Sequence, residues 1–304
     1  MTLREQLFAY FAEHHPRSMT GVEEARAVDP ARFDQVAERF LSWGIEALGQ
    51  DFLKLSADAY VTFSSDVILE QGRYELRGRY TNDSFEACKA SVYHDREVMD
   101  EYLWGVYVTN FLWAHHMELS IFFEDRFLKR LPASPKLVEI APGHGGWGAW
   151  ALHNRPDATL QGYDISPSSI DIATRITKAA GVSDRATYTE QNALDLSALP
   201  EASADALICS FLVEHLEQPE QLFAVIGHVL KPGGFGFVTG ALTAAQIDHI
   251  YEFKRESELI LLAEANGLRV VESLSTSPRR ILPKAKELPR SMGMLVQRRT
   301  QNNW

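Results

Sequence analysis

One segment, residues 137–148, constrains the fold of this chain more than any other. It reads LVEIAPGHGGWG, an apolar run with one acid inside it, Glu139, followed by a glycine-rich turn. A second apolar stretch, residues 150–152, follows at once. This pattern is typical of a buried strand, a tight turn and a helix start, an arrangement that brings backbone N–H groups and carbonyls close to a small cofactor.

After residue 135 apolar strands alternate with helical segments. The predicted strands cover residues 136–141, 158–163, 186–190, 204–210, 235–240, 268–273 and 293–298, and the predicted helices lie near 147–154, 167–180, 219–230 and 252–266. Strands separated by helices form a parallel sheet with helices on both faces. Residues 275–291 show no clear helix, so the last strand is expected to be antiparallel. The predicted fold class is a doubly wound, mostly parallel seven-stranded α/β sheet.

Residues 1–131 have a different, mainly helical pattern, and two prolines in residues 131–135 mark the boundary. Asp29 and Pro30 predict the N-cap and the first residue of a helix. We therefore expect a helical lid, residues 1–131, over a ligand-binding domain, residues 132–304.

Two parts of this lid have patterns that differ from a plain helix. Residues 59–80 fit either a hairpin or a loop with helix ends. A long aromatic helix is predicted from residue 95 to about residue 130, with a break expected at Gly105.

The composition excludes several classes of function. The chain has 304 residues, a net charge of −11 and no long stripe of Lys and Arg, which argues against a nucleic acid partner. No apolar run has the length of a membrane span, and the N-terminus lacks the features of a secretory signal. Cys88 and Cys209 lie far apart and indicate no disulfide framework. We expect a soluble cytoplasmic protein.

The bases after residue 278 form either a solvated surface or an attractor for an acidic substrate or partner.

The glycine turn alone does not identify the cofactor. Gly143, Gly145 and Gly148 fit the G-x-G-x-x-G pattern of NAD(P) sites. However, Glu139 puts a charge inside a parallel core strand, which is costly without a partner and which a dinucleotide site does not need. Asp164 ends the next predicted strand, where an acid can bind two ribose hydroxyls of either cofactor.

These residues, with Asn192-Ala193 after the third strand and the segments 213–223 and 229–234, resemble the class I S-adenosylmethionine-dependent methyltransferases over about residues 132–300. In that family the glycine turn holds the methionine end of the cofactor, the acid after the second strand holds the ribose, and the pair after the third strand meets adenine. The resemblance implies S-adenosyl-L-methionine as cofactor and contacts from Glu139, Ala141, Gly143, His144, Gly145, Asp164, Ile165, Asn192, Ala193 and Phe211.

Three positions depart from the pattern of this family. Ala141 replaces the first glycine, which costs little if its φ is negative. Asn192 replaces an aspartate, and its side-chain oxygen can still accept a hydrogen bond from the adenine amino group. His144 stands where a small residue is usual and is either an exposed turn residue or a contact to cofactor or substrate.

Fewer features of the sequence point to the residues that would contact the acceptor or take its proton. His215, after the fourth strand, could act as a base or could pack its loop. His115 and His116 in the aromatic helix could each be a base, a substrate ligand or structural. The expected acceptor pocket includes Tyr107, Phe111, Trp113 and Glu214. Adjacent histidines diverge on a helix, and no other His or Cys pair has metal-ligand spacing, so no metal is expected.

The sequence thus predicts methyl transfer from S-adenosylmethionine to a small molecule under the lid, with the acceptor atom open. One alternative keeps the cofactor for aminocarboxypropyl transfer or intramolecular cyclisation, which release methylthioadenosine. An NAD(P) enzyme and a non-catalytic binding or assembly subunit are further alternatives, and a homodimer through the N-terminal helices is left open.

Overall fold

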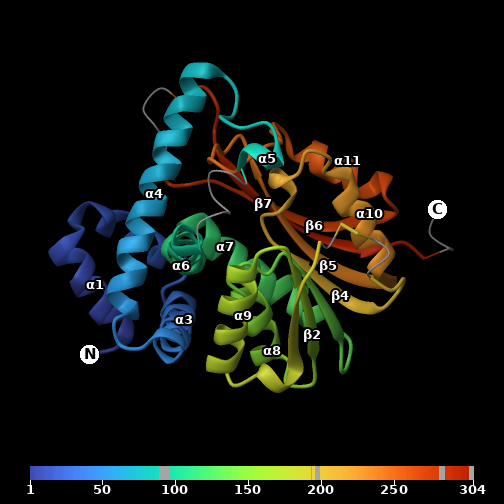
Figure 1. Ribbon diagram of the computed structural model, residues 1–304, viewed down its shortest axis with the longest axis horizontal. Coiled ribbons are helices and arrows are strands. Elements are labelled where there is room, and N and C mark those ends of the chain that lie inside the picture. The colour runs from blue at the N-terminus through green and yellow to red at the C-terminus, as the bar shows by residue number, and fades with distance from the viewer. Residues whose placement is uncertain (89–95, 193, 196–198, 281–284, 301–304) are drawn as a thin grey trace.

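The computed structural model describes residues 1–88, 96–192, 194–195, 199–280 and 285–300. Within these ranges seven strands form one sheet in the order β3-β2-β1-β4-β5-β7-β6 (Figure 1). Strands β1 to β5 pair in parallel, whereas β7 is antiparallel to both β5 and β6. The predicted fold class, including the antiparallel last strand, is confirmed.

The elements of the α/β part follow the predicted alternation. The strands are β1 (Lys136–Ile140), β2 (Thr159–Asp164), β3 (Ala186–Glu190), β4 (Ala204–Cys209), β5 (Leu230–Leu242), β6 (Leu268–Thr276) and β7 (Arg290–Arg298). Between them lie α8 (Gly146–Asn154), α9 (Pro167–Ala179), η5 (Ser183–Arg185), η7 (Val213–His215), α10 (Glu220–Val229) and α11 (Glu256–Ala265). Since parallel strands place their carboxyl ends at one edge, the turns after β1, β2 and β4 meet there.

The N-terminal region is helical. It contains α1 (Leu3–His14), η1 (Pro16–Ser18), α2 (Met19–Val28), α3 (Pro30–Leu48), α4 (Phe52–Arg77), α5 (Phe85–Cys88), α6 (Arg96–Leu112), α7 (Ala114–Phe122), the π-helical turn η3 (Phe123–Phe127) and η4 (Leu128–Arg130). As predicted, Pro30 begins α3, and the Asp29 side chain accepts a hydrogen bond from the Arg32 N–H at 3.1 Å. No helix in the described part of the chain is long and apolar enough to cross a membrane.

Helix α4 overturns the hairpin alternative for residues 59–80. The helix runs unbroken to Arg77 and ends at Gly78, whose φ is 70°. Its buried positions, which include Tyr60, Phe63 and Tyr74, recur every three or four residues and form one face of a helix. That burial outweighs the helix-breaking tendency of Gly72, where an added Cβ would meet no neighbouring atom.

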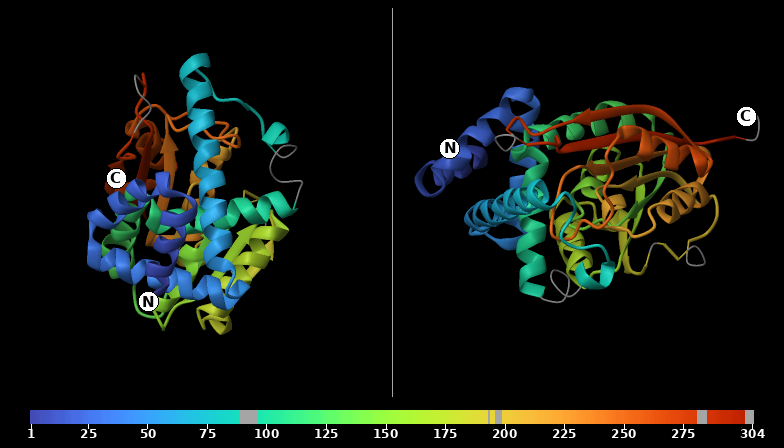
Figure 2. Two further views of the ribbon diagram at one scale, coloured as in Figure 1. Left: turned by 90° about the vertical axis from the view of Figure 1, so that its left-hand side faces the viewer. Right: turned by 90° about the horizontal axis from the view of Figure 1, so that it is seen from above.

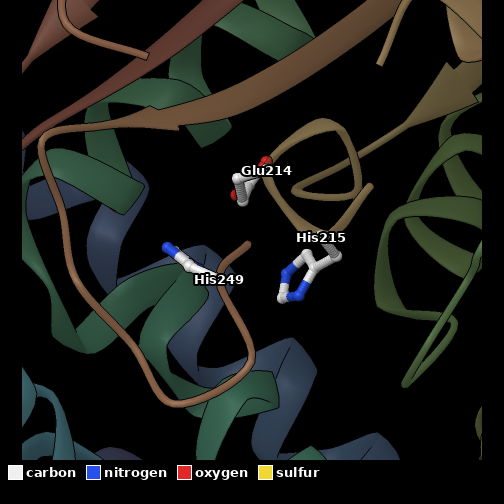
Figure 3. Close-up of side chains that lie close together, drawn as sticks. All are labelled: Glu214, His215 and His249. Carbon is white, nitrogen blue, oxygen red and sulfur yellow. The ribbon is translucent and has the colours of Figure 1, made fainter. Parts of the chain in front are cut away.

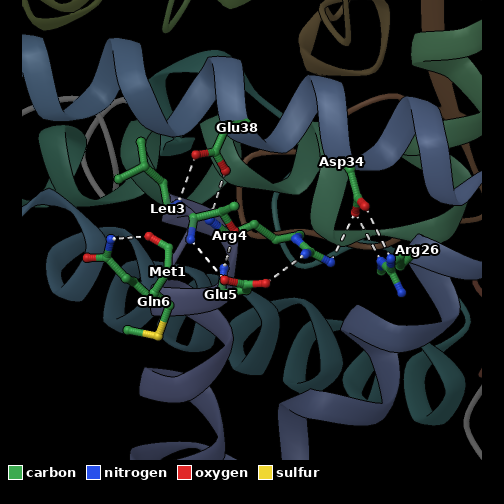
Figure 4. Close-up of polar contacts among 9 residues, drawn as sticks. Met1, Leu3, Arg4, Glu5, Gln6, Arg26, Asp34 and Glu38 are labelled. Atoms are coloured by element: carbon green, nitrogen blue, oxygen red, sulfur yellow. Dashed lines mark hydrogen bonds and ion pairs between the residues drawn. The ribbon is translucent and has the colours of Figure 1, made fainter.

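The first helix is attached to the third by backbone and side-chain contacts. Glu38 in α3 accepts hydrogen bonds from the N–H groups of Leu3 and Arg4 at 2.9 and 3.1 Å (Figure 4). These N–H groups have no partner within α1, so the carboxylate caps the helix from outside. Asp34, one turn earlier in α3, pairs with both Arg4 and Arg26. The contacts fix α1 and α2 against α3.

The predicted aromatic helix is interrupted at Trp113, between α6 and α7, and the break expected at Gly105 is wrong. Trp113 is extended, with φ −102° and ψ 128°. Gly105 lies inside α6, where a Cβ would come 2.8 Å from the carbonyl oxygen of Ala59. The glycine therefore permits close packing of α6 on α4 and does not end the helix.

The sheet is buried on both faces. On one face Leu137, Ala206 and Phe237 join a core with α8, α9 and the N-terminal helices. Alternate residues of the same strands, such as Val138, join a second core with α10 and α11. Glu139 is two residues from Leu137, so its side chain lies on the face of α8.

The N-terminal helices share the first of these cores with the sheet. Phe123 of η3 lies 4.9 Å, between ring centroids, from both Trp147 of α8 and Phe237 of β5. Gly293 of β7 lets α7 approach, because a Cβ there would come 2.8 Å from the side chain of Leu119. Figure 2 shows these helices gathered at one side of the sheet. The division into units 1–131 and 132–304 stays a prediction about how the chain is organised.

Candidate functional site

A cavity of about 1560 Å³ lies between the N-terminal helices and the carboxyl ends of β1, β2 and β4. Pockets for one small ligand measure about 300–1,000 Å³, so this cavity has room for a cofactor and a second molecule. Predicted cofactor residues that line it are Glu139, Ala141, Gly143, His144, Asp164, Ile165, Asn192 and Phe211. The sequence thus located much of the sheet side of the cavity.

Glu139 fixes the start of α8. Its Oε1 accepts a hydrogen bond from the Gly148 N–H at 3.1 Å, whereas its Oε2 is buried without a partner. A Cβ on Gly148 would come 2.3 Å from Oε2, so only glycine lets the carboxylate approach. The side chain is 2% exposed, and burial raises the pKa of Glu139 to about 8, although the Gly148 hydrogen bond opposes the shift.

Asp164 joins the turn after β1 to the turn after β2. Its Oδ2 accepts a hydrogen bond from the Gly143 N–H at 3.1 Å, and its Oδ1 accepts one from the Ser166 N–H at 2.9 Å. Burial raises its pKa, although these N–H groups favour the charged form. Gly143 has φ 53°, a left-handed conformation in which glycine is not strained.

Two expectations about the glycine turn need correction. Ala141 has φ 51°, so the condition under which alanine costs little is not met, and the residue is strained. Gly145 does not line the cavity. A Cβ on Gly145 would come 2.6 Å from that of Ala173, so this glycine serves the packing of the turn on α9.

His144 is buried, which contradicts its interpretation as an exposed turn residue. It is 5% exposed, and its Nδ1 accepts a hydrogen bond from the Gly146 N–H at 2.9 Å. Its Nε2 lies 3.1 Å from the side-chain nitrogen of Asn110 in α6. Burial lowers the pKa of His144 to about 3, so a neutral imidazole lies between the glycine turn and α6.

The predicted adenine contacts are described only in part. The Asn192 Oδ1 accepts a hydrogen bond from the Leu194 N–H at 3.0 Å, the geometry of an Asx turn, and the residue lines the cavity. Ala193 lies outside the described residues. Contact of Asn192 with adenine stays a prediction.

Phe211, directly after β4, is strained. Its φ is 52°, and its N–H donates to the hydroxyl of Thr239 at 2.9 Å, which holds the backbone in place. Its ring stacks on His116, with centroids 5.0 Å apart and planes at 28°. Strain of this kind persists only where neighbouring contacts enforce it, and it is frequent at functional sites.

Two of the four residues predicted for the acceptor pocket, Trp113 and Glu214, line the cavity. Tyr107 and Phe111 do not, because their side of α6 faces α3 and both side chains are fully buried in the core. The Tyr107 hydroxyl donates to the carbonyl of Phe40 at 2.9 Å.

His115 and His116 both lie in the cavity wall, and the expectation that adjacent histidines diverge is wrong here. Their ring centroids are 4.5 Å apart. Trp113 stacks on His115 at 5.1 Å, and Phe211 stacks on His116, so aromatic packing turns both rings to the same side. Burial lowers the pKa of His115 to about 3 and that of His116 well below 6.5.

The fold also assembles a group that sequence spacing did not indicate. Glu214, His215 and His249 each place one ligand-type atom within 4.8 Å of the others (Figure 3). Glu214 and His215 belong to η7, whereas His249 lies in the loop after β5. The pairing of β4 with β5, and backbone hydrogen bonds from Ile250 and Tyr251 to the carbonyl of Glu214, bring the two segments together, so no local motif marks this group.

The basic residues near the C-terminus are largely paired with acids. Arg279 pairs with Glu118, and Arg290 with Glu256. Arg280 pairs with Glu24 at the cavity wall. This favours an ion-paired surface over an attractor for an acidic substrate, since the charge is already balanced.

Comparison with known proteins identifies the α/β part of the chain. Residues 137–234 match the model of a methyltransferase domain. They form a class I S-adenosylmethionine-dependent methyltransferase domain. A ubiquinone biosynthesis O-methyltransferase of Xylella fastidiosa is 32% identical over 116 residues, which are 38% of this chain and 46% of that one. The matching stretch therefore spans less than half of that relative.

Solved structures share the fold of this methyltransferase domain. An O-methyltransferase family protein from Burkholderia thailandensis has a TM-score of 0.55 and 16% identity, covering 81% of this chain and 71% of that one. A Haemonchus contortus phosphoethanolamine N-methyltransferase solved with S-adenosylhomocysteine has a TM-score of 0.53 and 15% identity, covering 71% of this chain and 61% of that one. At these identities the similarity shows the fold alone.

Proposed function

We propose that this protein transfers a methyl group from S-adenosylmethionine to a small, mainly apolar acceptor enclosed in the cavity, with His116 as the base that removes the acceptor proton. The observation that carries the proposal is that His116, whose pKa burial lowers well below 6.5, lines the same cavity as the cofactor residues of the methyltransferase domain.

The cofactor residues fit S-adenosylmethionine. Glu139 leaves Oε2 buried without a partner, which suits the positively charged methionine end of the cofactor. Gly143 presents no side chain to the cavity, Asp164 would bind the ribose hydroxyls, and Asn192 would accept from adenine. The bound cofactor supplies an electrophilic methyl group, and the protein has to position the acceptor and take its proton.

The tautomer of His116 follows from its neighbours. The Thr109 hydroxyl donates its only hydrogen to the carbonyl of Val106 at 2.6 Å, and its oxygen lies 3.0 Å from the Nδ1 of His116. Nδ1 therefore carries a hydrogen and donates it to Thr109. The neutral ring keeps a lone pair on Nε2, which can accept a proton from an acceptor.

The walls of the cavity favour an apolar acceptor. Phe63, Tyr102 and Trp113 line it, and Phe63 stacks on Trp113 at 5.4 Å between centroids. Such walls exclude water, which would otherwise compete with the acceptor. A base at this point suits an acceptor that loses a proton, such as a hydroxyl group. The Xylella relative, by its name an O-methyltransferase of ubiquinone biosynthesis, supports hydroxylated ring compounds as the first acceptors to test.

The test starts from the purified protein with S-adenosylmethionine and a panel of phenols, catechols and amines, each with and without an apolar tail. Mass spectrometry identifies the products. S-Adenosylhomocysteine with a methylated phenol supports the proposal. Methylthioadenosine would instead indicate aminocarboxypropyl transfer or cyclisation, and cofactor binding without turnover on any compound would indicate a non-catalytic subunit.

The role of His116 is tested with the acceptor that this panel identifies. We expect His116→Gln to lower kcat by about 100-fold or more, a usual contribution of a general base, and to leave the affinity for S-adenosylhomocysteine unchanged. His153→Ala, an exposed histidine outside the cavity, is the control. Wild-type turnover in His116→Gln would remove His116 as the base.

The homodimer through the N-terminal helices stays a prediction. The apolar side chains exposed on α4 give it some support: Leu55, Ile68, Leu69 and Leu76. Sedimentation equilibrium on the wild type and on Leu76→Glu would test it, and a wild-type monomer would reject it.

A further inference from the structure

Glu214 carries a carboxylate that the protein does not satisfy. The residue is fully buried, and neither carboxylate oxygen has a hydrogen-bond partner. Among the described residues no Lys or Arg forms an ion pair with Glu214. Burial raises the pKa of Glu214 to about 7, although the backbone N–H groups of Glu214 and Ala241 and the nearby His215 oppose the shift. A charged carboxylate is therefore costly here unless a ligand supplies positive charge.

Two imidazoles are held next to this carboxylate in a defined tautomer. The His249 Nδ1 lies 2.6 Å from the carbonyl oxygen of Ala244, and the His215 Nδ1 lies 3.0 Å from that of Asp248. A carbonyl oxygen only accepts, so each Nδ1 carries the hydrogen. In the neutral form of each ring the lone pair is then on Nε2. Metal-binding histidines are commonly oriented by such a backbone contact.

We infer that Glu214, His215 and His249 form a binding site for a divalent transition-metal ion in the wall of the cavity. One ligand-type atom of each residue lies within 4.8 Å of the others, and Figure 3 shows the three side chains around a common space. Ligand atoms about 2.1 Å from a shared ion stand roughly 3–4 Å apart, so a small inward shift completes the site.

The surroundings suit a doubly charged ion. Asp248 is also buried, neither of its carboxylate oxygens has a hydrogen-bond partner, and its Oδ2 lies 3.6 Å from the Nδ1 of His215. Together with Glu214 it would balance two positive charges. Two nitrogens and one oxygen favour Zn²⁺, Co²⁺ or Fe²⁺ over Mg²⁺ or Ca²⁺, which prefer oxygen ligands.

The loop with His249 is fixed by the N-terminal helices. The Ala245 N–H donates to the Gln71 side chain of α4 at 2.9 Å, and the Asn82 side chain donates to the carbonyl of Ile247 at 2.6 Å. Glu214 and His215 belong to the methyltransferase domain, and His249 follows it in the sequence. The position of His249 therefore depends on contacts with the N-terminal region. All three line the cavity, so coordination positions beyond these three ligands would face the space for an acceptor.

The test uses the whole chain, treated with a chelator and then dialysed, without cofactor or acceptor. Zn²⁺ binding is measured by calorimetry, and Co²⁺ is used as a spectroscopic probe. We expect one ion per chain and a visible Co²⁺ spectrum that indicates nitrogen and oxygen ligands. Because the readout is binding, its failure is distinguishable from failure of the proposed methyl transfer.

Two variants and one control test the ligands. Glu214→Gln keeps the shape of the side chain, and we expect it and His249→Ala each to weaken binding by more than about 100-fold, since even residues behind the ligands contribute about 10–100-fold. His228→Ala is the matched control, a partly buried histidine outside the cavity that also contacts a carbonyl. Circular dichroism verifies that the variants fold. Absence of Zn²⁺ and Co²⁺ binding to the wild type, or equal binding by Glu214→Gln and wild type, would overturn the inference.

Discussion

Glu139 in β1 accepts a hydrogen bond from the N–H of Gly148 in α8, and it does so with a carboxyl group whose pKa burial raises to about 8. The resemblance to the methyltransferase family assigns this acid a contact with the cofactor, and a second role is to fix the turn. The hydrogen bond shows the role in the turn, and the second oxygen, which has no partner, is available for the cofactor.

This buried acid should make the stability of the cofactor-free protein depend on pH. Its pKa in the folded state lies above the ordinary value of 4.5, so the folded state binds the proton more tightly than the unfolded state. The stabilisation is complete below pH 4.5 and is lost as pH rises to about 8. The slope for one group is at most about 1.4 kcal/mol per pH unit.

Glu139→Gln should lack this pH-dependent component of the free energy of unfolding in urea titrations between pH 4.5 and 8. The exposed Glu190→Gln is the control, and identical slopes for Glu139→Gln and wild type would contradict the shift.

Asp164→Ala should weaken binding of S-adenosylmethionine and S-adenosylhomocysteine by about 1.5–3 kcal/mol, because hydrogen bonds to a charged group are lost. Calorimetry measures the loss. Asp157→Ala is a suitable control. Asp157 lies just before β2, whereas Asp164 is the last residue of that strand, and the Asp157 side chain accepts a hydrogen bond from the Ser134 N–H. The control should lose stability but not affinity. Equal affinity of Asp164→Ala and wild type would remove the ribose assignment.

Thr109→Val should lower kcat by roughly threefold to tenfold, the effect of one lost hydrogen bond, because His116 loses the acceptor that fixes its tautomer. The affinity for S-adenosylhomocysteine should not change, and the pH profile of kcat should shift, since the ring is no longer held with its hydrogen on Nδ1. Thr177→Val removes a buried hydroxyl from α9, outside the cavity, and should leave kcat unchanged. A loss of stability without any change in kcat or its pH profile would make Thr109 a structural residue only.

Ala141→Gly should stabilise the protein by about 1 kcal/mol, because glycine adopts a φ of 51° without the strain of a Cβ. For a chain of 304 residues that corresponds to a rise in Tm of roughly 1.5–2 °C. Ala9→Gly, at an exposed position inside α1, should destabilise by a similar amount because glycine is unfavourable in a helix. A lower Tm for Ala141→Gly would show that neighbouring contacts of the methyl group outweigh the strain.

The strongest predictions from the sequence concerned local patterns. The strand, glycine turn and helix around Glu139 and Gly143, and the acid that ends β2, could be located because each depends on residues close together in the chain. Helix α3 was predicted for the same reason, since Asp29 and Pro30 mark its start locally. The hairpin alternative for residues 59–80 was wrong because burial along one face of α4 outweighed local turn signals.

Tertiary structure alone decided which side chains meet. Tyr107 and Phe111 face the core because α6 packs on α3, and stacking on Trp113 and Phe211 turns His115 and His116 to one side. Glu214 and His249 are 35 positions apart and meet because β4 pairs with β5 and because the loop after β5 bonds to the backbone of Glu214. The sequence by itself determined the sheet and the glycine turn, since those follow from short-range periodicity and turn chemistry, and the resemblance to a known family indicated the class of domain. The lid contacts, the tautomer of His116 and the Glu214–His215–His249 group depend on long-range packing, which no local pattern encodes.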